Sequence, residues 1–131
     1  VLPYHKIPVY IFGAGITPWI VSQPTSQIDI WPTVLSMLGI DYNNNSLGID
    51  ILHNQRPYAF FVSDDYLGVS DGEYFWCYGI QTQREVLYRM GSGENILTEE
   101  PERATEMRTF GMNMQRVNLM AIDNKWTDPC E

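Results

Sequence analysis

The segment from residue 7 to residue 39 constrains the fold of this chain more than any other part of the sequence. It begins with an uninterrupted apolar run, Ile7–Phe12, and ends in the pattern Asp-x-x-Pro-Thr-x-Leu-x-x-Leu-Gly from Asp29 to Gly39. An apolar run bounded by Pro and Gly is typical of a strand buried on both faces. The second pattern predicts a helix with Asp29 at its N-cap, Pro32 in its first turn and Gly39 at its stop. The two together predict the last strand-helix step of an α/β fold.

Four short segments further on predict a small antiparallel sheet, because aromatic and β-branched residues are enriched in them. These segments are residues 58–62, 66–69, 74–80 and 85–88. Asp71-Gly72 lies between the second and the third. It predicts a tight hairpin turn in which both central positions favour positive φ.

A C-terminal helix is predicted from Glu102 to about Ala121. Its apolar residues recur at helical spacing, which indicates an amphipathic helix packed on the sheet; they are Met107, Phe110, Met114, Val117 and Ala121. A stripe rich in Met can also form an adaptable binding groove, although packing in the core is the simpler interpretation.

The length of 131 residues and the 44% of hydrophobic residues fit one compact domain. We divide it into a strand-helix and loop part at 1–57, antiparallel strands at 58–90, and a helix with its tail at 91–131. The formal charge of −8 argues against a nucleic-acid or anionic-membrane surface, since both need clustered Lys and Arg. The uncharged stretch between Lys6 and Asp29 is interrupted by Pro and Gly, so no membrane helix is predicted there.

The order of these elements resembles the C-terminal part of the sulfatase-like branch of the alkaline phosphatase superfamily, most of all the lipoteichoic acid synthase and phosphoglycerol transferase group. In that group a strand of the form Ile-Pro-Leu precedes Ser-x-Ile-Asp-x-x-Pro-Thr, as Ile7-Pro8-Val9 here precedes residues 26–33. Three further elements resemble the family's return loop and its Glu-Leu-Tyr and Glu-x-x-Asn-Leu motifs; they are residues 47–52, 85–88 and 94–97.

The resemblance implies a metal-dependent enzyme of phosphate or sulfate esters, with this chain as the C-terminal subdomain that ends a larger alkaline-phosphatase-like sheet and shapes one wall of the substrate cleft. In the family, the metal ions and the nucleophile are held by upstream motifs that include an Asp-His pair. No such pair occurs in these 131 residues. The resemblance therefore implies no catalytic residue, metal ligand or cofactor in this chain, and a divalent metal in an upstream part.

The same resemblance implies a periplasmic or extracellular location, or the outer face of the cytoplasmic membrane. The expected partner is the upstream catalytic part of the same protein, with membrane contact only through segments absent from this sequence. We also expect an exposed apolar face or self-association at residues 7–12, because a strand built for a large sheet would lack its neighbours.

Substrate-proximal candidates are few. His5 and Lys6 precede the predicted strand at its amino end, whereas ligands of α/β sheets bind at the carboxyl end, so a solvated position is the simpler interpretation. Gly13 and Gly15 lie in the loop that leaves the carboxyl end and could close against the missing active site. Gly-x-Gly without a third Gly and an immediate helix is no dinucleotide fingerprint.

The remaining polar residues have simple interpretations beside the functional ones. Asp64-Asp65 could contribute oxygen ligands to Ca²⁺ but also fits a solvated turn. His53 and Arg56 could contact an anion but also fit a surface loop.

Cys77 and Cys130 could form a disulfide in an exported protein or remain two free thiols. The alternative to the sulfatase-like interpretation is a free-standing ligand-binding or protein-interaction module, whose loops around Asp64 and His53 would recognise a ligand.

Overall fold

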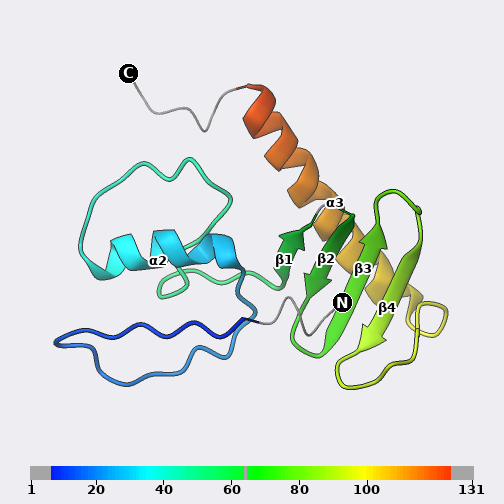
Figure 1. The fold of residues 1–131 in the computed structure, drawn as a ribbon, viewed down its shortest axis with the longest axis horizontal. Coiled ribbons are helices and arrows are strands. Elements are labelled where there is room, and N and C mark those ends of the chain that lie inside the picture. Colours follow the sequence, from blue (N-terminus) through cyan, green and yellow to red (C-terminus); the bar gives the residue numbers. More distant parts are fainter. Residues whose placement is uncertain (1–6, 64, 125–131) are drawn as a thin grey trace.

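The structure is a computed structural model that describes residues 7–63 and 65–124. It is a mixed α/β arrangement in which a four-stranded antiparallel sheet, in the order β1-β2-β3-β4, carries the long helix α3 across one face (Figure 1). The shorter helix α2 lies beside the sheet with the N-terminal part of the chain. The helical elements are η1 (Gln27–Asp29), α2 (Ile30–Met37) and α3 (Pro101–Asp123), and the strands are β1 (Ala59–Val62), β2 (Tyr66–Ser70), β3 (Tyr74–Gly79) and β4 (Glu85–Arg89).

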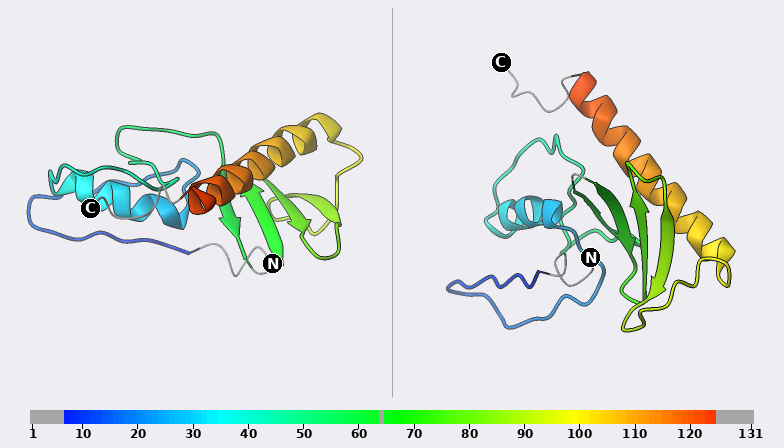
Figure 2. Two further views of the ribbon diagram at one scale, coloured as in Figure 1. Left: turned by 90° about the horizontal axis from the view of Figure 1, so that it is seen from above. Right: turned by 45° about the vertical axis from the view of Figure 1, so that its right-hand side comes forward.

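The antiparallel sheet and the C-terminal helix confirm the prediction from the sequence, with ends shifted by at most two residues. Side chains alternate between the two faces of each strand, so one set meets α3 and forms the core. Figure 2 shows α3 lying diagonally over that face. The buried core residues are Phe60, Leu67, Val69, Tyr74, Trp76, Leu87, Ile96, Ala104 and Met107. Met107 is fully buried among them, so core packing is the role of this part of the Met stripe.

A polar cluster fixes α3 on the sheet. The guanidinium of Arg108 donates to the Glu85 carboxylate, with Nε 3.0 Å from each oxygen, and the Trp76 indole N–H donates to the same carboxylate at 2.6 Å. One carboxylate on β4 thus receives donors from the helix and from the neighbouring strand. Because charged hydrogen bonds of this kind have defined geometry, they add a specific polar contact to the apolar packing of the helix on the strands.

Both outer strands are hydrogen-bonded to other parts of the chain. On β1 the Phe60 N–H donates to Ser26 Oγ at 2.7 Å. On β4 the Leu87 N–H donates to the Asn95 side chain at 3.1 Å, and its carbonyl accepts from the Ile96 N–H at 2.8 Å.

The β2–β3 hairpin differs from its prediction in one respect. Gly72 has a φ of 94°, but Asp71 is not in the left-handed region. The Asp71 side chain instead closes the turn, because its Oδ1 accepts from the N–H groups of Glu73 at 2.9 Å and Tyr74 at 2.6 Å. The prediction that both central positions have positive φ is therefore wrong, and a single glycine suffices.

The predicted strand at Ile7–Phe12 does not form. Residues 7–12 run without regular secondary structure, and every residue from 7 to 22 is exposed. A strand exists only where a neighbour supplies backbone partners, and no described segment pairs with these residues. The exposed apolar face expected at this place is present.

The thiol of Cys77 is free and buried in β3, and its burial raises the pKa of the thiol. Cys130 lies outside the described residues, so the predicted alternative of a disulfide stays a prediction.

We predict that Gly111→Ala destabilises the fold although alanine favours helices. A Cβ at this position of α3 would lie 2.8 Å from Val69 Cγ2 and 3.0 Å from the Trp76 ring, both fully buried. Overpacking of this kind costs about 1–3 kcal/mol, which exceeds the gain of about 1 kcal/mol in helix propensity. Urea unfolding measures the difference. Asn113→Ala, at an exposed position of the same helix, is the control, and a Gly111→Ala protein more stable than the parent would contradict the packing argument.

Candidate functional site

The most extensive candidate for a functional surface is the apolar segment formed by residues 7–21. Nearly all of its large hydrophobic side chains are in solvent; they are Ile7, Val9, Tyr10, Ile11, Phe12, Ile16, Trp19, Ile20 and Val21. Phe12 and Ile20 are 88% and 87% exposed. Monomeric proteins rarely leave so many neighbouring apolar side chains uncovered, so a patch of this size marks an interaction surface.

Both faces of the segment are apolar. Successive residues of an extended chain point in opposite directions, so Ile11 and Phe12 lie on different faces. Tyr10 and Phe12 share one face, where their rings stack with centroids 6.3 Å apart. A partner that covered one side alone would leave the other in water. Complete burial requires a partner that surrounds the segment, as neighbouring strands and the layers on both faces of a sheet do.

Helix α2 adds to the exposed apolar surface. Trp31 is 67% exposed and Leu38 is 66% exposed. They are seven residues apart and therefore lie on the same face of the helix. The opposite side of α2 is fixed inside the protein through Thr33, which is buried.

A buried ion pair holds the beginning of α2 against the following loop. Nη2 of Arg56 donates to both carboxylate oxygens of Asp29, and only 2% of the Asp29 side chain and 10% of the Arg56 side chain are exposed. The same carboxylate accepts from the N–H groups of Ser26 at 2.7 Å and Ile49 at 2.9 Å. Arg56 also donates from Nη1 to the Leu47 carbonyl at 3.1 Å. One carboxylate thus joins three segments of the chain.

Two hydroxyl groups of the same motif extend this network. The Thr33 hydroxyl donates to the Asp29 carbonyl at 2.6 Å and accepts from the Ile51 N–H at 3.2 Å. Ser26 Oγ accepts from the Phe60 N–H on β1. Gln23 completes the link by donating to the Ile51 carbonyl at 2.9 Å. The network therefore ties the end of the apolar segment, helix α2 and the sheet together.

This geometry corrects two predictions. Asp29 occupies the N-cap position of α2, but its side chain makes no capping hydrogen bond to that helix, because the carboxylate points to Arg56 and the loop. Arg56 is no surface loop residue, since a buried carboxylate requires a counter-charge and Arg56 supplies it. Pro32 and Gly39 lie where they were predicted, and Gly39 has a φ of 65° just after the helix.

The return loop requires a glycine at position 48. A Cβ at Gly48 would lie 2.0 Å from the carbonyl oxygen of Ile28, so only glycine allows the loop to approach the start of α2 this closely. The close approach brings the neighbouring Ile49 N–H to Asp29.

Asp50 and His53 form a second polar pair, at the edge of a cavity of about 310 Å³ beside the end of α2. His53 Nδ1 lies 2.6 Å from Asp50 Oδ2, and the imidazole is largely exposed. Burial acts to raise the pKa of Asp50, but hydrogen bonds from His53, Ser36 and the Leu52 N–H outweigh it, so the pKa lies below its usual value. The pair orders the loop, and the carboxylate of Asp50 is already engaged.

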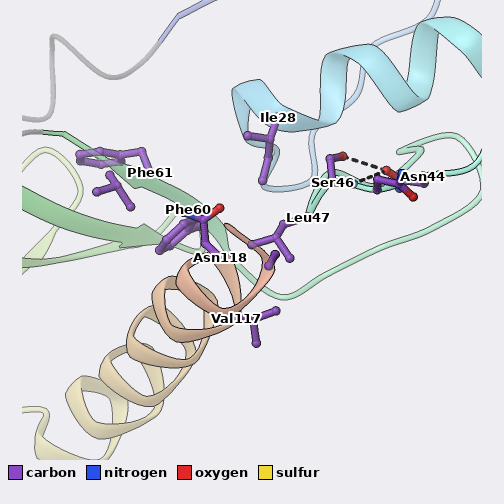
Figure 3. A pocket seen from close by; sticks show the side chains of 11 residues that line it. Ile28, Asn44, Ser46, Leu47, Phe60, Phe61, Val117 and Asn118 are labelled. Carbon is purple, nitrogen blue, oxygen red and sulfur yellow. Dashed lines mark hydrogen bonds between the residues drawn. The ribbon is translucent and has the colours of Figure 1, made fainter. Parts of the chain in front are cut away.

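A larger open cavity of about 520 Å³ lies between β1, the end of α3 and the loop before Gly48 (Figure 3). Its lining is mostly apolar, with amide and hydroxyl groups at the rim; it consists of Ile28, Asn44, Asn45, Ser46, Leu47, Phe60, Phe61, Val62, Val117, Asn118 and Ala121. Asn44 and Ser46 are hydrogen-bonded to each other at 2.8 Å. None of the described residues that line this cavity carries a charge, so they include no Asp, Glu, Lys or His that could act as a general acid or base.

The other residues predicted from the sequence are not brought together. His5, Lys6 and Asp64 lie outside the described residues. Gly13 and Gly15 lie in an exposed turn, with Gly15 at a φ of 82°. Asp65 accepts from the Gln81 amide at 2.6 Å. Within residues 7–63 and 65–124, no group of three or more His, Cys, Asp or Glu side chains could hold a metal ion.

No protein-family model matches the chain. In the described part of the chain, no helix combines the length and the apolar character needed to cross a bilayer.

We predict that Asp29→Ala lowers the free energy of unfolding by about 3–5 kcal/mol, because Arg56 would stay buried without its counter-charge. The control is Asp41→Ala, which removes an exposed carboxylate and should change stability by less than about 0.5 kcal/mol. The double variant Asp29→Ala/Arg56→Met should cost less than the sum of its two single changes, since they share one interaction. A cost for Asp29→Ala no larger than that of a lost cap, about 1 kcal/mol, would contradict the buried pair.

We also predict a pH dependence from Asp50. Because its pKa is lower in the folded state than in the unfolded state, the carboxylate stabilises the fold above its unfolded pKa, and this contribution is lost as the pH falls through the folded value. His53→Ala should raise the pKa of Asp50, measured by NMR titration of its carboxyl carbon. Gln55→Ala, a neighbouring exposed change, should leave it unchanged. An Asp50 titration that is the same in both variants would refute the role of His53.

Proposed function

We propose that this chain is the C-terminal subdomain of a sulfatase-like enzyme of the phosphoglycerol transferase or ester hydrolase type, and that it completes the fold and one wall of the substrate cleft. The metal ions and the nucleophile would belong to the upstream part of the same protein, outside the cytoplasm. The observation that carries the proposal is the apolar segment with both faces exposed.

The form of this segment supports an α/β partner. Ile7–Phe12 has the composition of a strand covered on both faces, yet its described surroundings provide neither strands nor covering layers. The sheet of a larger α/β body would supply all three at once: backbone partners, a layer above and a layer below. An isolated ligand or a flat protein surface would satisfy one side only.

The roles of the motif residues also support the proposal. Ser26, Asp29 and Thr33 carry the resemblance to the family, and each is buried and hydrogen-bonded to a distant segment. They act as structural residues that place α2 and the return loop, as expected of a subdomain without the catalytic centre. The alternative binding module has less support, because His53 and Asp65 are already engaged by Asp50 and Gln81.

We predict that the purified chain hydrolyses neither aryl sulfates nor phosphodiesters, with or without added divalent metal, because its sequence has no recognisable nucleophile motif and residues 7–63 and 65–124 hold no group of side chains that could bind a metal ion. A chromogenic ester assay measures this. Metal-dependent turnover that is abolished by a chelator would contradict the proposal that the catalytic centre lies upstream.

The decisive experiment uses the native gene product. Its mass and the residues that precede Val1 should reveal a longer polypeptide with an Asp-His pair shortly upstream. In that polypeptide, Ile11→Asp and Phe12→Asp should each lower the melting temperature and the metal-dependent ester hydrolysis, because they place a charge on opposite faces of a buried strand. Ile122→Asp, at an exposed position of α3, is the matched control. A product without upstream residues, or Ile11 and Phe12 variants that behave like the control, would overturn the proposal.

A further inference from the structure

The C-terminal end of α3 projects beyond the four strands, as its orange-red end shows in Figures 1 and 2. Its side chains there are unusually apolar for an uncovered helix: Leu119 is 52% exposed and Met120 is 45% exposed. This surface is separate from the apolar segment at residues 7–21, which belongs to a different part of the chain. It is not used by the proposed function.

Four residues form one stripe on this end of the helix: Arg116, Leu119, Met120 and Asp123. Their spacing of i, i+3, i+4 and i+7 places them on one face. Met107 precedes Arg116 by nine residues, about two and a half turns of 3.6 residues, so the stripe faces away from the sheet on which Met107 packs. The stripe is therefore an outward face with an apolar centre and one charge of each sign at its ends.

The charges of the stripe have no partner in the described structure. Neither Arg116 nor Asp123 takes part in an ion pair there, and two helical turns separate them along the axis. Asp123 also lies at the C-terminal end of α3, where the helix dipole disfavours a carboxylate, and the last turn contains no basic residue to offset it. A cation from outside the helix would remove this unfavourable interaction.

We infer that the stripe is a contact surface for a second copy of this chain, in which two α3 helices pack antiparallel about a two-fold axis. In that arrangement Arg116 of one copy meets Asp123 of the other, and the reverse pair forms at the other end. Leu119 of each copy lies opposite Met120 of its partner. The surface is complementary to itself, as a two-fold interface requires.

Charge complementarity favours the stripe over the other surfaces of the chain as the place where two copies meet. The rest of the molecule is strongly acidic, with a net charge of −8, so two copies repel each other over most of their surfaces. The stripe carries equal numbers of positive and negative residues and buries no unpaired charge on association. The contact covers only about two helical turns, so the surface that it buries is smaller than the roughly 1,200 Å² of a stable interface. We therefore expect a weak dimer whose population depends on the protein concentration.

The test is a charge exchange followed by sedimentation equilibrium of the whole chain. Arg116→Asp and Asp123→Arg should each shift the monomer–dimer equilibrium at least tenfold toward monomer, since each places like charges opposite each other. The double variant Arg116→Asp/Asp123→Arg restores both pairs and should recover the parental dimer. Arg84→Asp, which changes an exposed charge in the β3–β4 turn by the same amount, is the control for net charge.

Three results would overturn the inference. One is a parental chain that stays monomeric up to about 1 mM, the concentration range of the weakest contacts. Another is a double variant no more dimeric than the single ones. The third is association that only Phe12→Asp abolishes, which would assign it to the apolar segment at residues 7–21. None of these results bears on whether an upstream catalytic part exists.

Discussion

The buried pair of Asp29 and Arg56 is the interaction on which the placement of the N-terminal half depends. An isolated buried carboxylate is unfavourable, so Asp29 recruits a guanidinium and two backbone N–H groups, and these donors come from three separate segments. Helix α2 is only eight residues long and makes few contacts with the sheet. Its position is therefore fixed by this polar network and by the Ser26 link to β1 rather than by apolar packing.

The sheet half and the α2 half are organised by different forces. The sheet with α3 has a conventional core, in which Trp76, Leu67 and Met107 are fully buried. Between residues 7 and 57 most large apolar side chains lie in solvent, with Leu35 as an exception, whereas the polar Ser26, Asp29 and Thr33 are buried. Burial of apolar surface is the dominant favourable contribution to the free energy of folding. The exposed apolar side chains of this half therefore leave much of that contribution unused within the chain. The proposed upstream body would supply the missing burial.

The sequence correctly predicted the strands and the helix that are determined by signals between residues close together in the chain. Strand pairing at residues 59–89 followed from alternation and turn residues, and α3 followed from its helical period. Local signals could not decide whether a strand forms at Ile7–Phe12, because its formation depends on neighbouring strands, and the described residues provide none. The partner of Asp29 was missed, yet one signal was available: Arg56 is the only Lys or Arg between Lys6 and Arg84. Arg56 was therefore the one basic residue near in the sequence that could serve as the counter-charge of a buried carboxylate in that half.

The hydrogen bonds at the two outer strands have a consequence for how such a chain can join a larger body. Ser26 occupies the outward N–H of Phe60 on one side, and Asn95 with Ile96 occupies Leu87 on the other. Exposed strand edges are the usual templates for adding a further strand. Because one residue of each outer strand is already bonded within the chain, a strand added to this sheet would have to displace Ser26 from Phe60, or Asn95 and Ile96 from Leu87. The apolar segment at residues 7–21 requires no such displacement, so β-pairing with the sheet of a larger protein would begin there more readily than at this sheet.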